Sequence, residues 1–285
     1  MKKAFYLIHS RRPNRTLQGA VKIRRSVSTL RETPVFRPGK VEGLIIIIAA
    51  ALVLSSCASV SVVSPPMPAK EIYPRAVGPF MRQDICHIVA PGETLWRISK
   101  MYDVTIREIM RTNILHTEIL QKGQRLLVPH AAPLVPVIPL YASKKWQYII
   151  IHHSATDEGS SLEFDQYHQG RGWQGIGYHF VIDNGTKEKQ DGQIEVSPRW
   201  IKQKDGSHCR AGNMNEKAIG ICLVGNFSKE NVPAKQLDAL VYLVKILRKY
   251  YKVPLKRILG HDQVSGAATE CPGRKFPWYE FKDRL

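Results

Sequence analysis

The sequence predicts an α/β fold for the C-terminal half of the chain, with a mixed central sheet and flanking helices. Two runs of large apolar residues, 148–151 and 218–224, lack polar alternation, which is typical of strands buried in a sheet. Between residues 234 and 251, apolar residues recur instead at helical spacing. Because strands and helices alternate along this half, we expect one sheet layered against helices.

Capping and turn residues place the other elements of this half. Ser160 or Ser161 can cap a helix, and Pro233 suits the first turn of the long helix. An Asp-Asn-Gly-Thr stretch is a common hairpin turn. We therefore expect a helix at about 161–167, a strand at 178–182, a turn at 183–186 and a returning strand at 187–190.

A smaller module precedes this half and has the predicted order β-α-α-β. A short strand, 87–89, leads into a Pro-Gly turn and a helix with apolar residues three apart at Leu95, Ile98 and Met101. Thr105 is a good N-cap for a second helix. The strand 125–128 closes the module before Pro129.

This module resembles a LysM domain. The resemblance rests on Val-Ala-Pro-Gly-Glu-Thr-Leu-Trp-Arg-Ile at 89–98 and on Lys-Gly-Gln-Arg-Leu-Leu-Val-Pro at 122–129. It implies binding of glycans that contain N-acetylglucosamine, in a shallow groove between two loops. In this sequence the loops would consist of Gly92, Glu93 and Thr94 and of Asn113, Ile114 and Leu115. The alternative is a spacer of the same shape without sugar affinity.

The charge of the chain predicts the kind of partner, and its N-terminal segment predicts export. The net charge of +18 over 285 residues predicts a polyanionic partner such as nucleic acid, anionic lipid or an anionic cell wall. No module interleaves aromatic with basic residues, so we expect no nucleic-acid binding. A basic segment and an apolar run, Gly43–Leu54, form an export signal that is too short for a comfortable membrane span.

The run ends in Leu-Ser-Ser-Cys, which resembles a bacterial lipobox with Cys57 as the lipidated mature N-terminus. An uncleaved membrane anchor is the alternative. Either attachment places the protein in the cell envelope, at the outer membrane or in the periplasm if the bacterium has two membranes. Five cysteines are too few for a disulfide framework, although a Cys86–Cys209 bridge stays open.

Composition shifts divide the chain into five parts. They are a basic leader with the signal (1–56), a flexible tether (57–83), the small module (84–130), a linker stiffened by three prolines (131–145) and the C-terminal half (146–285). The linker predicts two modules that work independently, in a protein that we expect to be a monomer.

The strand at 148–151 runs straight into His152 and His153 and so delivers imidazoles to the rim of the sheet. Catalytic zinc needs three protein ligands and one open position. Further donors lie together near the end of the chain, at His261 and Cys271. We expect one Zn²⁺ held by His152, His261 and Cys271.

The C-terminal half resembles the zinc-dependent N-acetylmuramoyl-L-alanine amidases, a family that includes phage amidase-type lysozymes and peptidoglycan recognition proteins. Five ordered motifs carry the resemblance: 151–156, 170–173, 177–182, 218–227 and 260–273. The family's zinc ligands fall on His152, His261 and Cys271. Its active-site tyrosine falls on Tyr178.

The resemblance also implies roles for two further residues. The phage branch often has a basic residue two places before the cysteine, where this chain has Thr269, as in active recognition proteins. Threonine can donate a hydrogen bond to the oxyanion but brings no charge. His208 matches a cleft histidine that contacts substrate or shuttles protons. Cys222, where another branch has an acidic residue, is expected in the core.

These features predict a zinc hydrolase that cleaves the amide bond between N-acetylmuramic acid and the L-alanine of the stem peptide. Its partner is peptidoglycan, and it reaches the membrane through the lipid anchor or the apolar run. A non-catalytic peptidoglycan-binding protein is the rival, but Cys271 is present, and loss of the cysteine ligand usually marks that class. A glycosidase would need paired carboxylates that flank the bond, and these motifs offer none.

Overall fold

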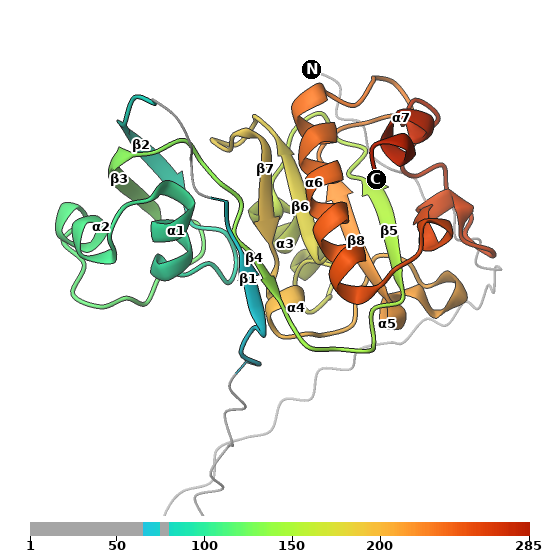
Figure 1. Cartoon of the computed structure of the whole chain (residues 1–285), viewed down its shortest axis with the longest axis horizontal. Coiled ribbons are helices and arrows are strands. Elements are labelled where there is room, and N and C mark those ends of the chain that lie inside the picture. Colours follow the sequence, from blue (N-terminus) through green and yellow to red (C-terminus); the bar gives the residue numbers. More distant parts are fainter. Residues whose placement is uncertain (1–64, 75–79) are drawn as a thin grey trace, which may run out of the picture. The chain divides into compact units, whose positions relative to one another are not determined.

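A five-stranded mixed sheet forms the centre of the C-terminal half (Figure 1). The computed structural model describes residues 65–74 and 80–285. The strands lie in the order β7-β6-β8-β5-β9. Pairs β6–β8, β8–β5 and β5–β9 are parallel, and β6–β7 is antiparallel. The strands are β5 (Tyr148–His153), β6 (Phe180–Asn184), β7 (Asp191–Val196), β8 (Ala218–Leu223) and β9 (Ile258–Gly260).

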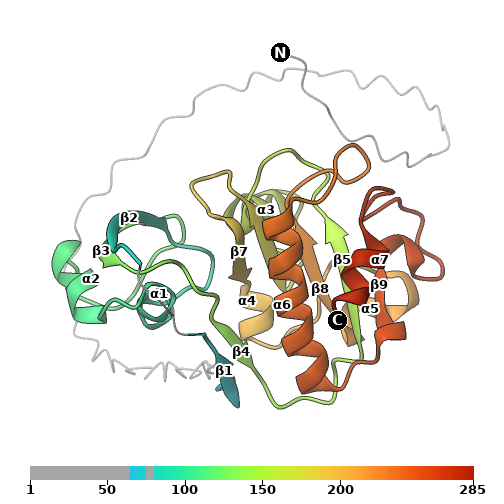
Figure 2. The same ribbon diagram turned by 45° about the horizontal axis from the view of Figure 1, so that its top comes forward.

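Helices cover both faces of this sheet, which confirms the predicted α/β fold. Helix α6 (Ala234–Tyr251) has the predicted bounds and lies along one face (Figures 1 and 2). Phe180 and Ile182 of β6 share a buried core with its apolar stripe. Val181, which points to the opposite face because side chains alternate along a strand, packs with Phe164 of α3 (Ser161–Gly170).

Three predicted boundaries in this half are wrong. The strand expected at 178–182 begins at Phe180 and continues to Asn184, into the predicted turn. Helix α3 has Ser160 as its N-cap and continues to Gly170, beyond Tyr167. The returning strand begins at Asp191, after the predicted 187–190. Lys187 and Glu188 both adopt the left-handed conformation, with φ of 53° and 57°, so the chain is still turning there.

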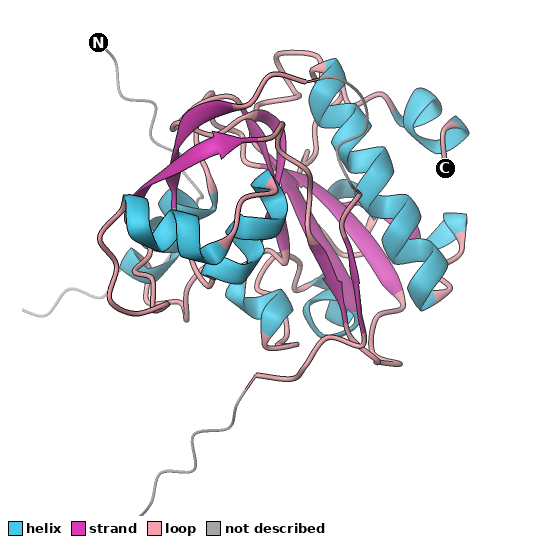
Figure 3. Cartoon of the chain, turned by 60° about the vertical axis from the view of Figure 1, so that its left-hand side comes forward, coloured by secondary structure: helices cyan, strands magenta, loops and turns pink. Residues whose placement is uncertain are grey.

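The small module has the predicted β-α-α-β order (Figures 1 and 2), and Figure 3 shows its helices lying beside its strands. It contains β2 (Gln83–Ile88), α1 (Leu95–Tyr102), α2 (Ile106–Thr112) and β3 (Arg125–Ala131). Thr94 and Thr105 cap the two helices, and Thr105 forms a capping box with Glu108. A core of its own packs around Leu95, Ile98, Ile109, Leu126 and Val128.

The proline-rich segment 131–145 packs against the C-terminal half. Within it, β4 (Ile138–Leu140) pairs antiparallel with β1 (Lys70–Ile72). Ile138 and Leu140 are buried in the same core as α6. The indole of Trp200 donates to the carbonyl of Pro139 at 2.7 Å, so this linker is fixed to the domain that follows it.

Short helices complete the described chain: α4 (Pro198–Ile201), η1 (Ala211–Asn213), α5 (Met214–Lys217), η2 (Leu255–Arg257), η3 (His261–Gln263) and α7 (Trp278–Asp283). Among residues 65–74 and 80–285, no helix has the length and apolar character of a membrane span. The predicted signal and Cys57 lie outside the described residues.

Candidate functional site

The three predicted metal ligands converge at one edge of the sheet. His152 lies near the carboxyl end of β5. His261 directly follows β9, which pairs in parallel with β5. Parallel strands bring their carboxyl ends to the same edge, so the two imidazoles meet there. Cys271 arrives from the loop after η3. One donor atom from each of the three residues lies within 4.8 Å of the others.

This donor set fits a zinc ion. The Cys271 Sγ lies 3.5 Å from His152 Nδ1, close to the separation of about 3.5 Å that tetrahedral zinc with ordinary Zn–N and Zn–S bonds requires. Burial raises the pKa of the Cys271 thiol to about 12. A thiolate at this position therefore needs a bound cation, and metal binding would release the proton.

His208 orients the His152 ring. Its Nε2–H donates to the carbonyl of Ala218 at 3.3 Å, and its Nδ1 lies 3.0 Å from His152 Nε2. Burial lowers the pKa of His208 to about 3, so the ring is neutral and Nδ1 can only accept. His152 therefore carries its proton on Nε2 and directs the Nδ1 lone pair toward Cys271, a typical arrangement around a metal-ligating histidine.

A glycine makes room for this contact, which the sequence did not reveal. A Cβ added to Gly220 of β8 would lie 2.4 Å from His208 Cδ2. The glycine between two isoleucines in the predicted strand was the available signal, because an isolated glycine in a strand often marks a close approach.

Backbone contacts hold Cys271 in place. The amide of His153 donates to Cys271 Sγ at 3.3 Å, and the Thr269 hydroxyl accepts from the Cys271 amide at 3.2 Å. Thr269 is half-buried beside the metal-ligand candidates. It therefore orients the cysteine loop, whatever it does toward substrate.

Tyr178 reaches the same place from the segment before β6. Its ring centroid lies 5.3 Å from that of His152. Burial, followed by the nearby thiols of Cys222 and Cys271, raises the pKa of Tyr178 well above its usual value. The hydroxyl therefore keeps its proton and can donate it in a hydrogen bond.

Three other histidines of this half accept backbone hydrogen bonds. Nδ1 of His153 accepts from the Phe227 amide, Nδ1 of His179 from Gly220, and Nδ1 of His168 from Gly177. Cys86 and Cys209 are both free, so the bridge left open by the sequence is not formed. Cys222 is fully buried, as expected of a core residue.

A hollow of about 670 Å³ opens beside His261 and His208. Trp173 lines it, is 41% exposed and stacks on His168 with ring centroids 4.6 Å apart. Trp200 and Phe227 are instead buried in the core. Arg199 and Arg210 also line the hollow, so an aromatic residue and two basic residues surround it. The Arg199 guanidinium donates to the backbone carbonyls of Ile176 and Asp205. Neither arginine stood out in the sequence.

The predicted glycan-binding loops of the small module differ in accessibility. Gly92, Thr94 and Ile114 are exposed, and Leu115 is half-buried. Glu93 is buried and lies 2.9 Å from His87 Nε2. The Asn113 side chain bonds the Leu127 amide and carbonyl, so these two polar side chains have partners inside the module.

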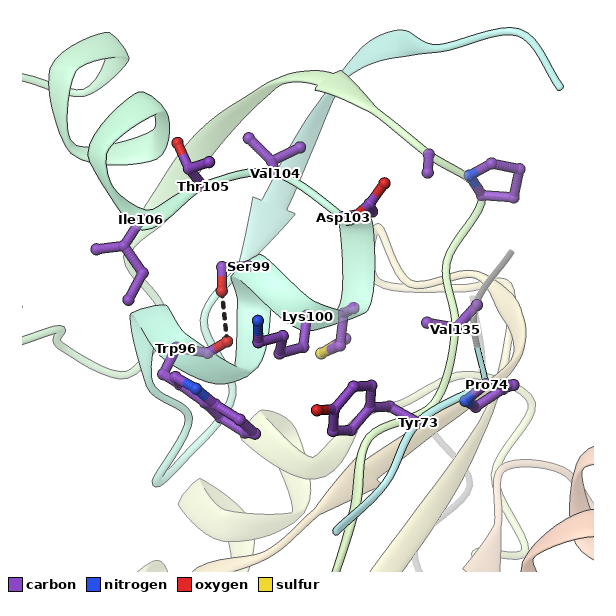
Figure 4. Close-up of a pocket in the computed structure, with 13 residues that line it drawn as sticks. Tyr73, Pro74, Trp96, Ser99, Lys100, Asp103, Val104, Thr105, Ile106 and Val135 are labelled. Atoms are coloured by element: carbon purple, nitrogen blue, oxygen red, sulfur yellow. Dashed lines mark hydrogen bonds between the residues drawn. The ribbon is translucent and has the colours of Figure 1, made fainter. Parts of the chain in front are cut away.

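A second hollow of about 670 Å³ lies elsewhere on this module. Figure 4 shows Tyr73, Trp96 and Lys100 around it. The rings of Tyr73 and Trp96 meet edge to face with centroids 6.2 Å apart. This surface lies outside the predicted loops.

Comparison with known proteins identifies both modules. A family described as N-acetylmuramoyl-L-alanine amidase matches residues 142–274, and the LysM domain matches residues 87–129. The endolysin of Escherichia phage T7 is 32% identical over 142 residues, which cover 46% of this chain and 84% of the endolysin. The chain belongs to the N-acetylmuramoyl-L-alanine amidase family.

Two further matches cover about half of this chain. Peptidoglycan-recognition protein LB of Drosophila melanogaster is 36% identical over 137 residues, 44% of this chain and 54% of that protein. The chain therefore spans about half the length of this relative. A solved amidase, LysC from Clostridium intestinale URNW, is 34% identical over 50% of this chain and 88% of its own, with a TM-score of 0.42.

Proposed function

We propose that this protein is a zinc-dependent peptidoglycan hydrolase that cleaves the amide bond between N-acetylmuramic acid and L-alanine. One observation carries the proposal. His152, His261 and Cys271 converge with zinc-like spacing beside an open hollow, in a chain of the amidase family. Zinc bound there would polarise the scissile carbonyl and activate a water molecule.

The chain's own residues would supply the remaining functions. His208 fixes the His152 ring, and Thr269 fixes the cysteine loop. The protonated hydroxyl of Tyr178 would donate to the oxyanion of the tetrahedral intermediate. Trp173 offers a face for a sugar or peptide group, and Arg199 and Arg210 offer positive charge for stem-peptide carboxylates.

The LysM module supports binding to the cell wall, and the net charge of +18 suits an anionic polymer. We propose that export and lipidation at Cys57 place the enzyme at the envelope membrane. Labelled fatty acid should enter the wild-type protein, whose mass should lack residues 1–56, and should not enter Cys57→Ala. An unlabelled mature protein that retains the apolar run would instead support an uncleaved anchor.

The second candidate is peptidoglycan recognition without turnover, because the relatives include recognition proteins. Retention of the complete ligand set favours the enzyme. Mass spectrometry of purified peptidoglycan incubated with the protein decides between the two. An amidase releases stem peptides that begin with a free L-alanine amine, whereas a recognition protein releases none.

A matched pair of variants tests the metal site. Cys271→Ser should lose most bound zinc and the release of peptides, because a hydroxyl is a much poorer zinc ligand than a thiolate. Cys86→Ser, which alters an exposed free cysteine of the small module, should keep both. Full activity and zinc content in Cys271→Ser would overturn the assignment.

A further inference from the structure

The LysM module contacts α3 of the amidase domain. Lys122, in the turn before β3, donates from Nζ to Asp165 Oδ2 at 2.7 Å and lies 3.3 Å from the side-chain oxygen of Gln169. The Asp165 side chain is only 5% exposed. A Cβ added to the neighbouring Gly123 would lie 3.5 Å from Leu162, so the turn rests on the helix.

The same helix holds the backbone that leads into Tyr178. The second oxygen of Asp165, Oδ1, accepts from the Ile176 amide at 2.9 Å. His168, one turn further along, accepts from the Gly177 amide at 3.2 Å. Two successive amides directly before Tyr178 are therefore fixed by side chains of α3.

A glycine permits this close approach. Gly175 has a φ of +84°, and a Cβ added to it would lie 2.6 Å from Asp165 Oδ1. The carboxylate of Asp165 thus packs directly on the backbone and bonds Lys122 and Ile176 at once. A substitution at Lys122 therefore alters the contacts of the Asp165 carboxylate, which holds the backbone of residues 175–178 in place.

The start of α3 is tied to the LysM module as well. Glu195 Oε2 accepts from the Ser161 amide at 2.6 Å, and Oε1 pairs with Lys189 Nζ at 2.7 Å. Lys189 also donates to the carbonyl of Ile88 in β2 at 2.8 Å. The side chains of this ion pair are 1% and 0% exposed, so its geometry is fixed by the elements that enclose it.

We propose that the LysM module, besides binding the wall, positions Tyr178 through α3, and that Lys122 is the principal positioning residue. The proposal rests on the proposed amidase function and adds a structural dependence of catalysis on the LysM module. Loss of the Lys122 ammonium leaves the buried Asp165 carboxylate with the neutral donors of Gln169 and Ile176 and without its positively charged partner, which costs free energy that a shift of α3 can relieve. Tyr178 would move with the 175–178 backbone.

The test uses charge reversal in the full-length chain. Lys122→Glu places a carboxylate against Asp165 and should lower kcat on a soluble muropeptide about 10-fold, within the range for residues that couple two sites. KM and bound zinc should stay unchanged. Lys122→Arg keeps the positive charge and should retain wild-type turnover. Lys122→Met removes the charge without adding repulsion and should show a smaller loss of kcat. It replaces Lys122→Glu in the test if that variant folds poorly.

Arg107→Glu is the matched control, because Arg107 is exposed on α2 of the same module. It should leave kcat at the wild-type value. Wild-type turnover in both Lys122→Glu and Lys122→Met, or a loss confined to wall affinity, would overturn the proposal.

Amide hydrogen exchange gives a readout that does not depend on activity. The segment that contains Ile176 and Gly177 should exchange faster in Lys122→Glu than in wild type or Arg107→Glu. Unchanged exchange there would overturn the positioning role. If exchange is faster in Lys122→Glu but the wild-type protein releases no stem peptide, the positioning role is supported and the proposed amidase function is overturned.

Discussion

At the scale of single residues, the proton on Tyr178 is the group whose contribution can be isolated most cleanly. Because burial raises the pKa of Tyr178, the hydroxyl keeps its proton near neutral pH and can act as a hydrogen-bond donor. Tyr178→Phe removes only this donor. We expect kcat to fall about 100-fold, the usual cost of one oxyanion donor, with zinc content and KM preserved.

Steady-state kinetics on a soluble muropeptide measure this change. Tyr167→Phe removes an exposed hydroxyl on α3 and should have no effect. A wild-type kcat in Tyr178→Phe would show that the oxyanion is stabilised by other groups.

The residues of the candidate metal site were predictable, but the contacts that orient them were not. A buried strand that ends in histidine and a late segment with His261 and Cys271 are sufficient to suggest the ligands. The tautomer of His152 depends on His208, which approaches through space from a loop, and on the missing Cβ of Gly220. Such contacts have no fixed spacing along the chain.

At the scale of elements, His168 links the stability of α3 to pH. Burial, and then the charges of Arg199 and Arg171, lower its pKa from 6.5 to about 4. In the unfolded chain the imidazole binds a proton below about pH 6.5, whereas in the folded chain it does not until about pH 4. The unfolded state therefore binds more protons in this window, and stability falls as the pH drops from 6.5 toward 4.

Urea unfolding of wild type and His168→Gln at pH 6.5 and 5 measures this contribution. Glutamine can still accept from the Gly177 amide but does not titrate, so the loss on acidification should be smaller in the variant. His116→Gln alters an exposed histidine and should keep the wild-type pH dependence. Identical slopes in all three proteins would contradict the assignment to His168.

The two loops of the LysM module supply a second test at this scale. Ile114 is 79% exposed at the tip of its loop, with a φ of 52°. If the predicted groove binds glycan, Ile114→Ala should weaken pull-down on insoluble peptidoglycan several-fold, because a buried apolar contact of this size contributes about 1–2 kcal/mol. Trp96→Ala, in the other hollow, should bind as wild type. The opposite ranking would move glycan binding to the Tyr73–Trp96 surface.

At the scale of the whole molecule, periodicity and turn residues predicted both modules and their order, but not their contact. The three prolines of 131–145 suggested a stiff linker between independent modules. Prolines are equally compatible with an edge strand, and the segment pairs with β1 and packs against Trp200. Two ion pairs join the modules, Lys122–Asp165 and Arg125–Glu188, and their partners are 43 and 63 positions apart, beyond the reach of any local pattern.

This contact changes what removal of the LysM module should do. Independent modules predict that deletion of 84–130 weakens wall binding and leaves turnover of soluble muropeptides unchanged. The structure instead predicts that deletion removes the Lys122 contact to Asp165 and the Ile88 carbonyl that accepts from the buried Lys189. We expect the melting temperature to fall by at least about 4 °C, equivalent to about 1–2 kcal/mol for a chain of this size, and kcat to fall with it.

Thermal unfolding and muropeptide turnover of the deletion variant check this expectation. Ile114→Ala is the appropriate comparison, because it keeps the module in place and alters only an exposed loop residue. It should retain the wild-type melting temperature and kcat. A deletion variant with both values at wild-type level would show that the contacts between α3 and the LysM module contribute neither stability nor positioning, and that the proline-rich segment acts as a simple spacer.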